Sequence, residues 1–560
     1  MKSKVAWWDK LGKPQYGGEM VIRANMNIKE FDPYFDKGLT SIYGGWLEKL
    51  VSDDWLLDPS VWDYQPAWHP SKYMKGQLAE SWEFTDPLTH VVHLRKGIHW
   101  QNIPPANGRE FTADDVVFHF NRLYSPGIGF TKPSPLRMEI GLQDLISVTA
   151  MDKYTVVFKF RTLNSESIMQ TLNGVAQTEC IENPDAVKQW GDVKDWHHAI
   201  GTGPFILKDF VFNSSAILIK NPNYWGYDER YPQNKLPYTD TIKFLIIPDD
   251  DEAMAAMGAG KIDIMERVTF KQAQAMQKTN PGILQIPTPR AQAVTIQPRN
   301  DRGPFNDVRV RKAMQMAIDL TTIAKDYYGG LVDPYPSTVT SRYMKGWGFP
   351  YEEWPQDLKD EYAYNPTAAK KLLVDAGYPR GFKTNIVADI AVDLDLLQIV
   401  KSYFAQVGIE MEIRPMESAA CTDFVTIDHK YDQLAYRQYG PFGHTYSPIQ
   451  AIRRLHTSNL SNWLMVSDPV IDAFYPKALA ANSEDELKQI VRDMNDRVAR
   501  QHFAISLLQP MEYSLCQPWL KGYHGQIHSI WMGGVGCPSR LSLYGARFWI
   551  DQNLKKSMGH

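Results

Sequence analysis

GTGPFILKDFVFNSSAILIKNPNYWG, residues Gly201–Gly226, is the most informative part of this sequence. It opens on Gly-Thr-Gly-Pro, a combination typical of a tight turn. Two β-favouring runs follow, Phe205–Phe212 and Ala216–Lys220, and the polar residues between them predict a hairpin. Asn-Pro-Asn ends the second run, and the aromatic pair Tyr224–Trp225 comes next. The residues alone therefore predict a buried hairpin closed by two large rings.

The pattern G-T-G-P-[FY]…N-P-x-Y-W-G resembles the signature hairpin of the extracytoplasmic solute-binding proteins of ABC importers. The resemblance is to family 5, the large family that carries oligopeptides, dipeptides, nickel chelates, opines and some oligosaccharides. Other blocks resemble the same family in the same order, namely LAESW, LRKGIHW, FTADDVVFHF, FNDVRVRKAMQMAID and YNPTAAKKLLVDAGY. The resemblance extends from Tyr16 to about Phe548.

The resemblance implies an α/β protein with the two-lobed type II periplasmic-binding-protein fold and an extra, cluster C-like subdomain in the first lobe. A ligand would be enclosed between the lobes by hinge closure. The expected ranges are 1–16 for a mostly unstructured leader, 17–55 with 200–285 and 516–555 for the core of lobe I, 56–199 for its extra subdomain, and 286–515 for lobe II.

Length and composition describe a large globular protein. At 560 residues the chain is too long for one core, and 44% apolar with 22% charged residues is an ordinary balance. The net charge of −4 argues against a general nucleic-acid binder and against a basic membrane-surface protein. No apolar run approaches the roughly 18 residues that a membrane-spanning helix needs.

The first twenty residues contain basic side chains but no apolar core of a signal peptide. Either the protein is cytosolic or its export signal is missing from this sequence. The family resemblance favours the second reading, a mature periplasmic or extracellular protein that is associated with the membrane. The expected partners are a small polar organic ligand and the membrane permease of an ABC importer, with no nucleic acid, and the expected state is a monomer.

Three further patterns predict particular elements. Residues 53–76 are rich in Trp, Pro and Asp without a period, which predicts an irregular surface insertion. Asn365 before Pro366 predicts the start of a helix. The capping box at Ser483 predicts a long helix that runs to about Ser506.

Catalytic and metal-binding motifs are absent from the sequence. There is no G-x-S-x-G elbow, P-loop, H-E-x-x-H or G-x-G-x-x-G pattern, so we expect no enzymatic activity, cofactor or metal. Asp249–Asp251 is more typical of a solvated turn than of a metal site. His197–His198 and His444 have no ligand partners at metal spacing and are more typical of surface or hydrogen-bonded histidines.

The four cysteines, Cys180, Cys421, Cys516 and Cys537, show no metal-binding spacing. Cys516 and Cys537 are close enough in sequence to form a disulfide in an oxidising compartment. Buried thiols are the alternative, and both readings stay open.

The stretch 431–448, YDQLAYRQYGPFGHTYSP, is the strongest candidate for a ligand site. Tyr431–Tyr436 predicts a strand, and its exit loop would point into the cleft between the lobes. Peptide carriers of the family typically place an Asp in this loop, where it pairs with the α-ammonium of the ligand. Here the loop contains no Asp or Glu. Because a buried ammonium without a carboxylate is costly, a free-amino peptide is less favoured than in the family at large.

Other side chains of the loop suit other ligands. Arg437 and Arg290 suit a carboxylate or sugar hydroxyls, because guanidinium offers a planar fork of donors. The aromatic rings suit pyranose rings or apolar groups. Loop packing is the alternative for the rings, a surface salt bridge for Arg437, and a polar loop for the residues after the first strand, Met20–Asn25. The candidate ligand residues are Asn25, Met26, Asn27, Arg290, Arg437, Gln438, Tyr439, Phe442, His444 and Tyr446.

We therefore expect the solute receptor of an ABC importer, binding an oligosaccharide or a modified peptide without chemistry. A receptor for free-amino oligopeptides is one alternative. A secreted hydrolase with carboxylates far apart in sequence is another, and a non-transport interaction module is the third.

Overall fold

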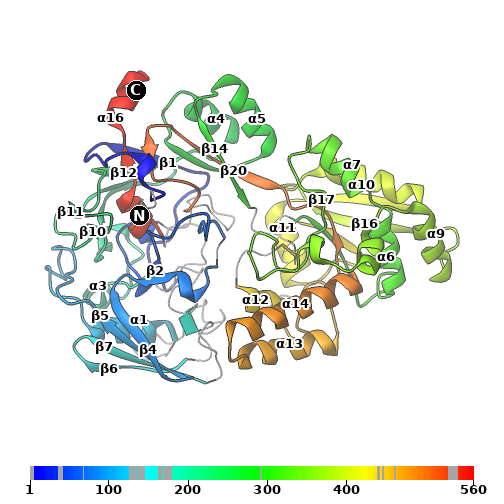
Figure 1. The fold of residues 1–560 in the computed structure, drawn as a ribbon, viewed down its shortest axis with the longest axis horizontal. Helices are drawn as coiled ribbons and strands as arrows, with labels where there is room; N and C mark the ends of the chain where they lie inside the picture. The colour runs from blue at the N-terminus through cyan, green and yellow to red at the C-terminus, as the bar shows by residue number, and fades with distance from the viewer. Residues whose placement is uncertain are drawn as a thin grey trace, which may run out of the picture. The chain divides into compact units, whose positions relative to one another are not determined.

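The computed structural model of the chain describes residues 6–35, 42–66, 68–124, 134, 145–161, 168–169, 180–289, 293–437, 440, 442–443, 447–459, 462–526 and 540–560. The chain divides into two compact units. Unit 1 contains Met1–Thr288 and Glu512–His560, and unit 2 contains Pro289–Met511. Figure 1 labels many of the helices and strands of both, and each unit is built around one larger β-sheet.

Unit 1 is built on a seven-stranded sheet. The strand order is β14 (Leu284–Pro289), β20 (Met511–Cys516), β13 (Ile264–Val268), β1 (Glu19–Ala24), β12 (Thr241–Ile246), β9 (Ser215–Lys220) and β8 (Phe205–Val211). β1 pairs in parallel with β12, whereas β9 is antiparallel to both β12 and β8. The predicted hairpin is confirmed as β8 and β9, and it forms one edge of the sheet.

The Gly-Thr-Gly turn before β8 lies directly against the backbone of Trp46. The Gly203 amide donates to the Trp46 carbonyl at 2.8 Å. The side-chain oxygen of Gln101 accepts from the Gly201 amide at 3.2 Å. A Cβ atom on Gly201 would lie 1.7 Å from the Trp46 carbonyl oxygen. Glycine is needed at this position because two backbones approach too closely for any side chain.

A four-stranded antiparallel sheet is the second large element of unit 1. Its order is β4 (Ala79–Asp86), β5 (Thr89–Leu94), β7 (Thr155–Phe160) and β6 (Leu145–Asp152), and α1 (Ala113–Tyr124) packs on β6 and β7. Two-stranded ladders join β2 (Val51–Asp53) to β3 (Met74–Gly76), β10 (Tyr227–Asp228) to β11 (Tyr231–Lys235) and β21 (Leu520–Lys521) to β22 (Trp549–Ile550). The other helices are α3 (Pro184–Trp190), α4 (Asp250–Gly258), α5 (Phe270–Thr279), α15 (Leu541–Arg547) and α16 (Gln552–Ser557).

A fully buried ion cluster ties α1 to the segment after β1. The guanidinium of Arg122 on α1 donates to both carboxylate oxygens of Asp32, at 2.9 and 2.6 Å, and to Glu182 at 3.0 Å. His119, one turn earlier, pairs with the other oxygen of Glu182. All four side chains are at most 1% exposed. The cluster therefore replaces the hydration of four ionisable groups by contacts among themselves.

The prediction that residues 53–76 form a surface insertion is wrong. Trp55, Trp62 and Trp68 in this segment are between 1% and 4% exposed. The Trp62 ring lies 6.3 Å from that of Trp68, and the Trp55 ring lies 5.6 Å from that of Tyr544 on α15. The large rings of this segment fill the core. The sequence did not indicate this, because buried positions recur at a regular spacing only in a helix or strand, and this segment has almost no regular structure.

The described part of the expected leader, residues 6–16, has little regular structure but makes contacts with unit 1. The Trp7 ring lies 5.5 Å from that of Trp55 and 5.4 Å from that of His524. A short 3-10 turn, Asp9–Leu11, follows it. The backbone amide of Gly17 then donates to the Tyr238 carbonyl at 2.9 Å. Aromatic contacts and backbone pairing hold this stretch on unit 1.

Unit 2 is built on a five-stranded sheet. The order is β17 (Ile409–Met416), β16 (Phe382–Asp389), β18 (Leu434–Tyr436), β15 (Thr295–Pro298) and β19 (Ile505–Ser506). β16 is parallel to both β17 and β18, and β15 is antiparallel to β18 and β19. The carboxyl ends of β16 and β18 therefore meet at the same edge of the sheet.

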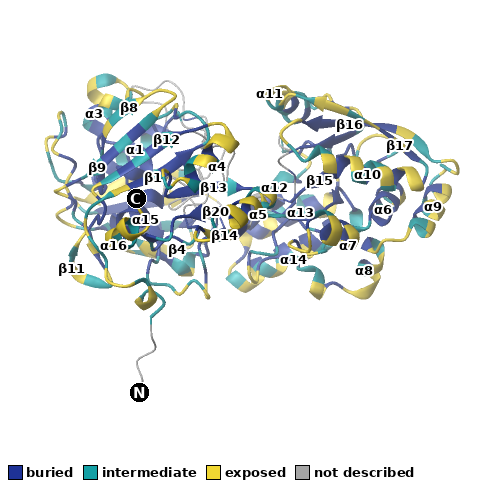
Figure 2. Ribbon diagram, turned by 90° about the horizontal axis from the view of Figure 1, so that it is seen from above, coloured by how far each residue is buried: buried dark blue, intermediate teal, exposed yellow. Residues whose placement is uncertain are grey.

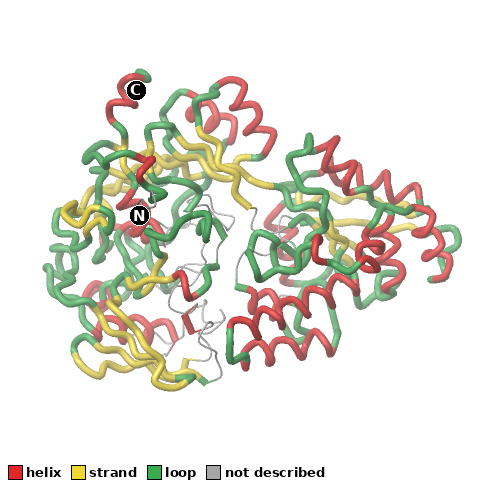
Figure 3. The backbone as a smooth tube through the Cα atoms, in the orientation of Figure 1, coloured by secondary structure: helices red, strands yellow, loops and turns green. Residues whose placement is uncertain are grey.

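Helices flank the strands of unit 2 (Figure 3). They are α6 (Val308–Met316), α7 (Leu320–Thr322), α8 (Gln356–Tyr362), α9 (Pro366–Asp375), α10 (Leu394–Gln406), α11 (Ser418–Thr422), α12 (Pro448–Arg454), α13 (Pro469–Ala480) and α14 (Glu484–Gln501). Asn365 caps α9 and Pro366 is its first residue, which confirms that predicted start. Figure 2 shows the usual pattern of burial, with β16 in dark blue and much of α9 in yellow.

The helix predicted from Ser483 starts as expected but ends five residues early. The Ser483 hydroxyl accepts from the Glu486 amide at 3.1 Å, and α14 ends at Gln501. His502 takes a left-handed conformation there, with φ of 44°. After two further residues the chain forms β19, which pairs with β15. Pairing with the sheet outweighs the helical pattern of the residues before Ser506.

Two further observations bear on cysteine chemistry and on the membrane. The buried thiol of Cys516 donates to the Gln517 carbonyl at 3.4 Å. Cys516 is a free thiol in the structure, as the alternative of buried thiols expects, and Cys537 lies outside the described residues. In the described part of the chain, we find no helix with the length and apolarity needed to cross a membrane.

Candidate functional site

The candidate residues of unit 1 follow β1. Asn25, Met26 and Asn27 are each half-buried. The side-chain amide of Asn27 donates to Asn213 Oδ1 at 2.8 Å, and its oxygen accepts from the Asn213 amide at 3.1 Å. Asn213 lies in the turn between β8 and β9. Asn27 therefore fastens the exit of the first strand to the tip of the hairpin.

Arg437 in unit 2 directly follows β18 and is only 4% exposed. Its Nη2 donates to the Thr422 hydroxyl at 3.1 Å, and its Nη1 donates to the Thr426 hydroxyl. Its Cζ lies 5.8 Å from the centre of the Trp463 ring. Two hydroxyls and an indole thus fix the guanidinium at the carboxyl edge of the sheet, away from the protein surface.

Asp389, which the sequence did not single out, ends the neighbouring strand β16. Its Oδ1 accepts from the Ala391 amide at 2.9 Å and from the Ser418 hydroxyl at 2.5 Å. Within the described residues, no donor is hydrogen-bonded to its Oδ2. The register of β16 and β18 matches Ala388 with Tyr436, so Asp389 and Arg437 follow side by side. Burial raises the pKa of the Cys421 thiol; the charge of Arg437 opposes this rise and the charge of Asp389 adds to it.

The other candidates of the 431–448 stretch divide into one buried ring and several residues without a described position. Phe442 is 1% exposed, and its carbonyl accepts from the Ala293 amide at 2.8 Å. This is loop packing within unit 2. The candidates Arg290, Gln438, Tyr439, His444 and Tyr446 lie outside the described residues.

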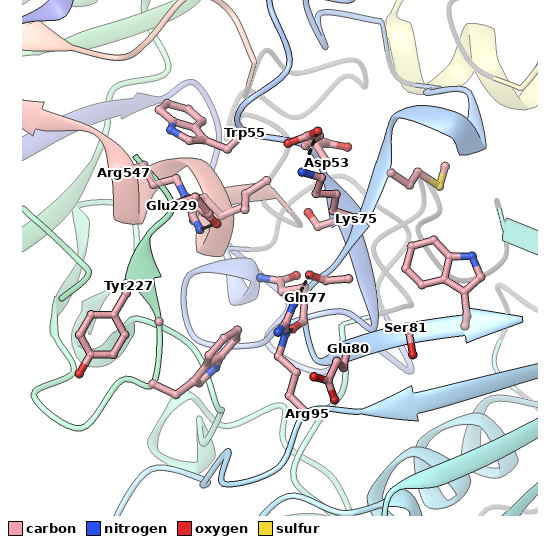
Figure 4. Close-up of a pocket in the computed structure, with 18 of the residues that line it drawn as sticks. Asp53, Trp55, Lys75, Gln77, Glu80, Ser81, Arg95, Tyr227, Glu229 and Arg547 are labelled. Carbon is pink, nitrogen blue, oxygen red and sulfur yellow. Dashed lines mark hydrogen bonds and ion pairs between the residues drawn. The ribbon is translucent and has the colours of Figure 1, made fainter. Parts of the chain in front are cut away.

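A pocket of about 660 Å³ opens in unit 1 (Figure 4). The end of β2, the ladder partner β3, the starts of β4 and β10, the residue after β5, and α15 contribute its walls. The charged side chains that line it are Asp53, Asp54, Lys75, Glu80, Arg95, Glu229 and Arg547, and the large rings are Trp55, Trp82, Tyr224, Trp225 and Tyr227. A cavity of this size, with rings and a few polar groups, has the dimensions of a small-molecule site.

Most charges in this pocket are paired within the protein. Lys75 lies 3.1 Å from Asp54, and Arg547 forms a two-bond ion pair with Glu229. Arg95 differs, because its Nε donates to the Gln77 carbonyl at 2.8 Å and its Nη2 to the Gly76 carbonyl at 3.3 Å. These bonds fix the guanidinium without neutralising its charge.

A buried carboxyl group, that of Glu48, is hydrogen-bonded to three residues that line this pocket. Glu48 is 0% exposed and accepts from Tyr224 Oη and Trp225 Nε1, both at 2.9 Å, and from Gln77 Nε2 at 3.2 Å. Burial raises the pKa of Glu48 to about 7, even though these hydrogen bonds favour the charged form. The group therefore titrates near neutral pH at the point where the hairpin exit meets the β2–β3 ladder.

This raised pKa predicts a pH-dependent stability. The folded-state pKa of Glu48 lies near 7 and the ordinary value is 4.5, so the folded protein holds the proton more tightly. The contribution is complete below about pH 4.5 and is lost as the pH rises through about 7. At pH 8 we expect Glu48→Gln to be more stable than the wild type by about 3 kcal/mol, with little difference at pH 5.

Urea denaturation at pH 5 and pH 8 measures this difference, and Glu80→Gln is the matched control at an exposed position. An equal effect of Glu48→Gln at both pH values would contradict the titration.

Two residues of the acidic cluster have structural roles, and one of the paired histidines lies on the surface. Asp249 caps α4 by accepting from the Glu252 amide at 2.8 Å, and Asp250 pairs with Arg23 at 2.7 Å. His197 is exposed and lies 2.6 Å from Asp195. Within the described ranges, no group of three or more His, Cys, Asp or Glu side chains is arranged to hold a metal ion.

Comparison with known families tests the expected identity. Residues 74–455 match the family model of the bacterial extracellular solute-binding proteins, family 5 Middle. That match spans more than half of the chain. The chain belongs to this family. Solute-binding proteins of family 5 are transport receptors and not enzymes, so the protein is the solute receptor of an ABC importer.

Relatives of this family 5 receptor carry different ligand names. Heme-binding protein A of Haemophilus influenzae is 24% identical over 469 residues, covering 80% of this chain and 81% of the relative. The glutathione-binding protein GsiB of Shigella flexneri is 25% identical over 405 residues, covering 71% and 70%. The dipeptide-binding protein of Escherichia coli is 28% identical over 351 residues, covering 60% and 62%.

Solved structures agree with the two-lobed α/β fold expected for a family 5 receptor. The periplasmic binding protein DppA of Helicobacter pylori, in complex with the peptide STSA, gives a TM-score of 0.71 at 21% identity and covers 96% of this chain and 99% of its own. The oligopeptide-binding protein AppA of Bacillus subtilis, with a nonapeptide, gives 0.67 at 19% identity and covers 96% and 100%. The predicted type II periplasmic-binding-protein fold is confirmed.

Proposed function

We propose that this receptor binds a peptide or a modified peptide and delivers it to the permease of an ABC importer. The relatives and solved structures described above are named for peptides, dipeptides, glutathione and heme. No sugar ligand is among those names, so the oligosaccharide reading has no support from them. The rings that suit pyranoses suit apolar side chains equally well.

One observation supports a zwitterionic ligand, namely the opposite charges at the ends of two adjacent parallel strands. Asp389 ends β16 and Arg437 follows β18, and the parallel register places them at the same edge. Ligands of α/β folds bind at the carboxyl ends of such strands. In this proposal Arg437 receives a ligand carboxylate, and the open Oδ2 of Asp389 receives its α-ammonium.

Asp389 changes the argument drawn from the loop sequence. The loop after β18 lacks an acidic residue, and a buried ammonium without a carboxylate partner would be strongly disfavoured. Asp389 supplies that carboxylate from the neighbouring strand and is itself only 3% exposed. The site can therefore bind a peptide with a free amino group, and the proposal does not require that this group be chemically blocked.

Calorimetric titration with the dipeptide Met-Leu, its N-acetyl derivative and its C-terminal amide tests the proposal. We expect Asp389→Asn to weaken binding of free Met-Leu about 30-fold, or about 2 kcal/mol, while affecting the N-acetyl derivative little. Arg437→Met should show the reverse selectivity, weakening free Met-Leu but not the amide. The N-acetyl derivative lacks the ammonium that Asp389 would bind, and the C-terminal amide lacks the carboxylate that Arg437 would bind.

Arg414→Met is the matched control, because this arginine pairs with Glu412 on an exposed part of β17. The same charge is removed from unit 2 without touching the proposed site. If both site variants bind all three ligands as the wild type does, the assignment of Asp389 and Arg437 fails. If none of the three peptides binds the wild type, the dipeptide class is excluded.

A further inference from the structure

We propose that the pocket of unit 1 is a second binding site, which takes an anionic solute with a flat apolar group. This inference is independent of the peptide proposal, because every residue that lines the pocket belongs to unit 1. Arg95 is the anion contact, and the rings around it receive the apolar group. The pocket volume of about 660 Å³ suits a molecule of this kind.

The charge of Arg95 is the basis for choosing an anion. Its Nε and Nη2 are bound to the carbonyls of Gln77 and Gly76, which holds the guanidinium in place. In the described part of the chain, no carboxylate lies within 4.0 Å of it, and no acceptor is bonded to its Nη1. A guanidinium that is already fixed by backbone carbonyls of the protein loses little conformational freedom when it binds a carboxylate or a phosphate.

The other cations of the pocket are less suited to this role. Lys75 is already 3.1 Å from Asp54, and its side chain is 57% exposed. Arg547 is held by both oxygens of Glu229. An arriving anion would have to compete with a carboxylate at either residue. Arg95 offers its charge without that competition.

The rings argue for a flat apolar group on the ligand. The Arg95 guanidinium lies 5.8 Å from the centre of the Trp225 ring, so cation and indole form one continuous surface. The indole nitrogen of Trp225 is bonded to Glu48 at 2.9 Å, which fixes the plane of the ring. Tyr227 and Trp55 lie on the same side of the pocket as Glu229 and Arg547 in Figure 4. A preformed cation beside fixed rings suits an aryl carboxylate or an aryl phosphate.

Glu80 allows a second test, in which the expected effect on binding is opposite to that of removing Arg95. It is exposed, lines the pocket near Arg95 in Figure 4, and has no ion pair among the described residues. An anionic ligand is repelled by this carboxylate, whereas a zwitterionic or cationic ligand is attracted to it. Removing its charge therefore distinguishes the two classes of ligand.

The test measures binding of 2-naphthoate and of neutral 2-naphthylmethanol to the full chain by ligand-observed NMR. We expect the wild type to bind the naphthoate and to bind the alcohol at least about tenfold more weakly. Arg95→Gln should weaken naphthoate binding about tenfold, and Glu80→Gln should strengthen it about twofold. Tyr227→Ser should weaken it several-fold, and because Tyr227 is 52% exposed this variant is not expected to disturb folding.

Lys96→Gln is the matched control. Lys96 is the next residue, and it is exposed with its ammonium 5.5 Å from the Tyr154 ring instead of in the pocket. It removes the same charge and should leave naphthoate binding unchanged. Arg437→Met should also leave it unchanged, since that residue belongs to unit 2.

Four results would overturn the proposal. These are no naphthoate binding to the wild type, equal binding of the neutral alcohol, equal effects of Arg95→Gln and Lys96→Gln, or weaker binding after Glu80→Gln. Loss of binding in Arg437→Met but not in Arg95→Gln would place the probe in the peptide site instead. Failure of Met-Leu to bind leaves these results unaffected, so the two proposals fail separately.

Discussion

Gly201→Ala is expected to destabilise unit 1 by about 3 kcal/mol or more. The new methyl group would lie 1.7 Å from the carbonyl oxygen of Trp46 and 2.4 Å from its carbonyl carbon. Neither atom can rotate away as a side chain does, so the turn before β8 must separate from the Trp46 backbone. That movement also strains the 2.8 Å hydrogen bond from the Gly203 amide to Trp46.

Urea denaturation followed by circular dichroism measures the loss, with Gly282→Ala as the control. Gly282 is an exposed turn residue, and a Cβ atom there would meet nothing within 4 Å. The control should change the free energy of unfolding by well under 1 kcal/mol. A Gly201→Ala variant as stable as this control would show that the turn can move without cost.

Arg122→Met is expected to reduce the free energy of unfolding by about 3–5 kcal/mol. The substitution leaves the carboxylate of Asp32 buried without its cation, while Glu182 keeps His119. In the wild type, both carboxylate oxygens of Asp32 accept hydrogen bonds from Arg122. Hydrogen exchange should show the loss of protection in α1 and in the segment after β1, which the cluster joins.

A double variant separates charge from packing in this cluster. Adding Asp32→Asn to Arg122→Met removes the unpaired carboxylate, so the double variant should be more stable than Arg122→Met alone. Arg161→Met, at an exposed position at the end of β7, is the control for loss of one arginine. If the double variant loses the sum of two separate costs, the destabilisation comes from packing and not from an uncompensated charge.

Local chemistry in the sequence predicted where elements begin better than where they end. Caps and turns are decided by a few adjacent residues, and so Asn365, Ser483 and the hairpin at Gly201 were all identified. The end of α14 was not, because β19 pairs with β15, about 200 residues earlier in the chain. Helical periodicity carries no information about such a distant partner.

Burial in segments without regular structure was also beyond the sequence. The tryptophans of residues 53–76 are in the core, yet neither a period of 2 nor one of 3.6 marks them. The same holds for Trp7, which packs on Trp55 and His524. Two of these partners, Tyr544 for Trp55 and His524 for Trp7, come from the other end of the chain.

The candidate site was predictable only in part. A cation directly after a strand is visible in the sequence, so Arg437 was identified. Asp389 has the same placement on β16, but its importance depends on β16 and β18 being parallel neighbours. The unit 1 pocket combines residues from 52 to 547, and no local pattern could have brought Arg95 and Trp225 together.

The strand order of unit 1 also has a consequence for biosynthesis. β20 lies between β14 and β13 but is made from residues 511–516, after the whole of unit 2. Unit 2 is continuous and can fold while its neighbour still lacks this strand. Until the final segment has left the ribosome, the facing edges of β13 and β14 expose unpaired backbone groups. During that interval both edges are open to pairing with a foreign strand.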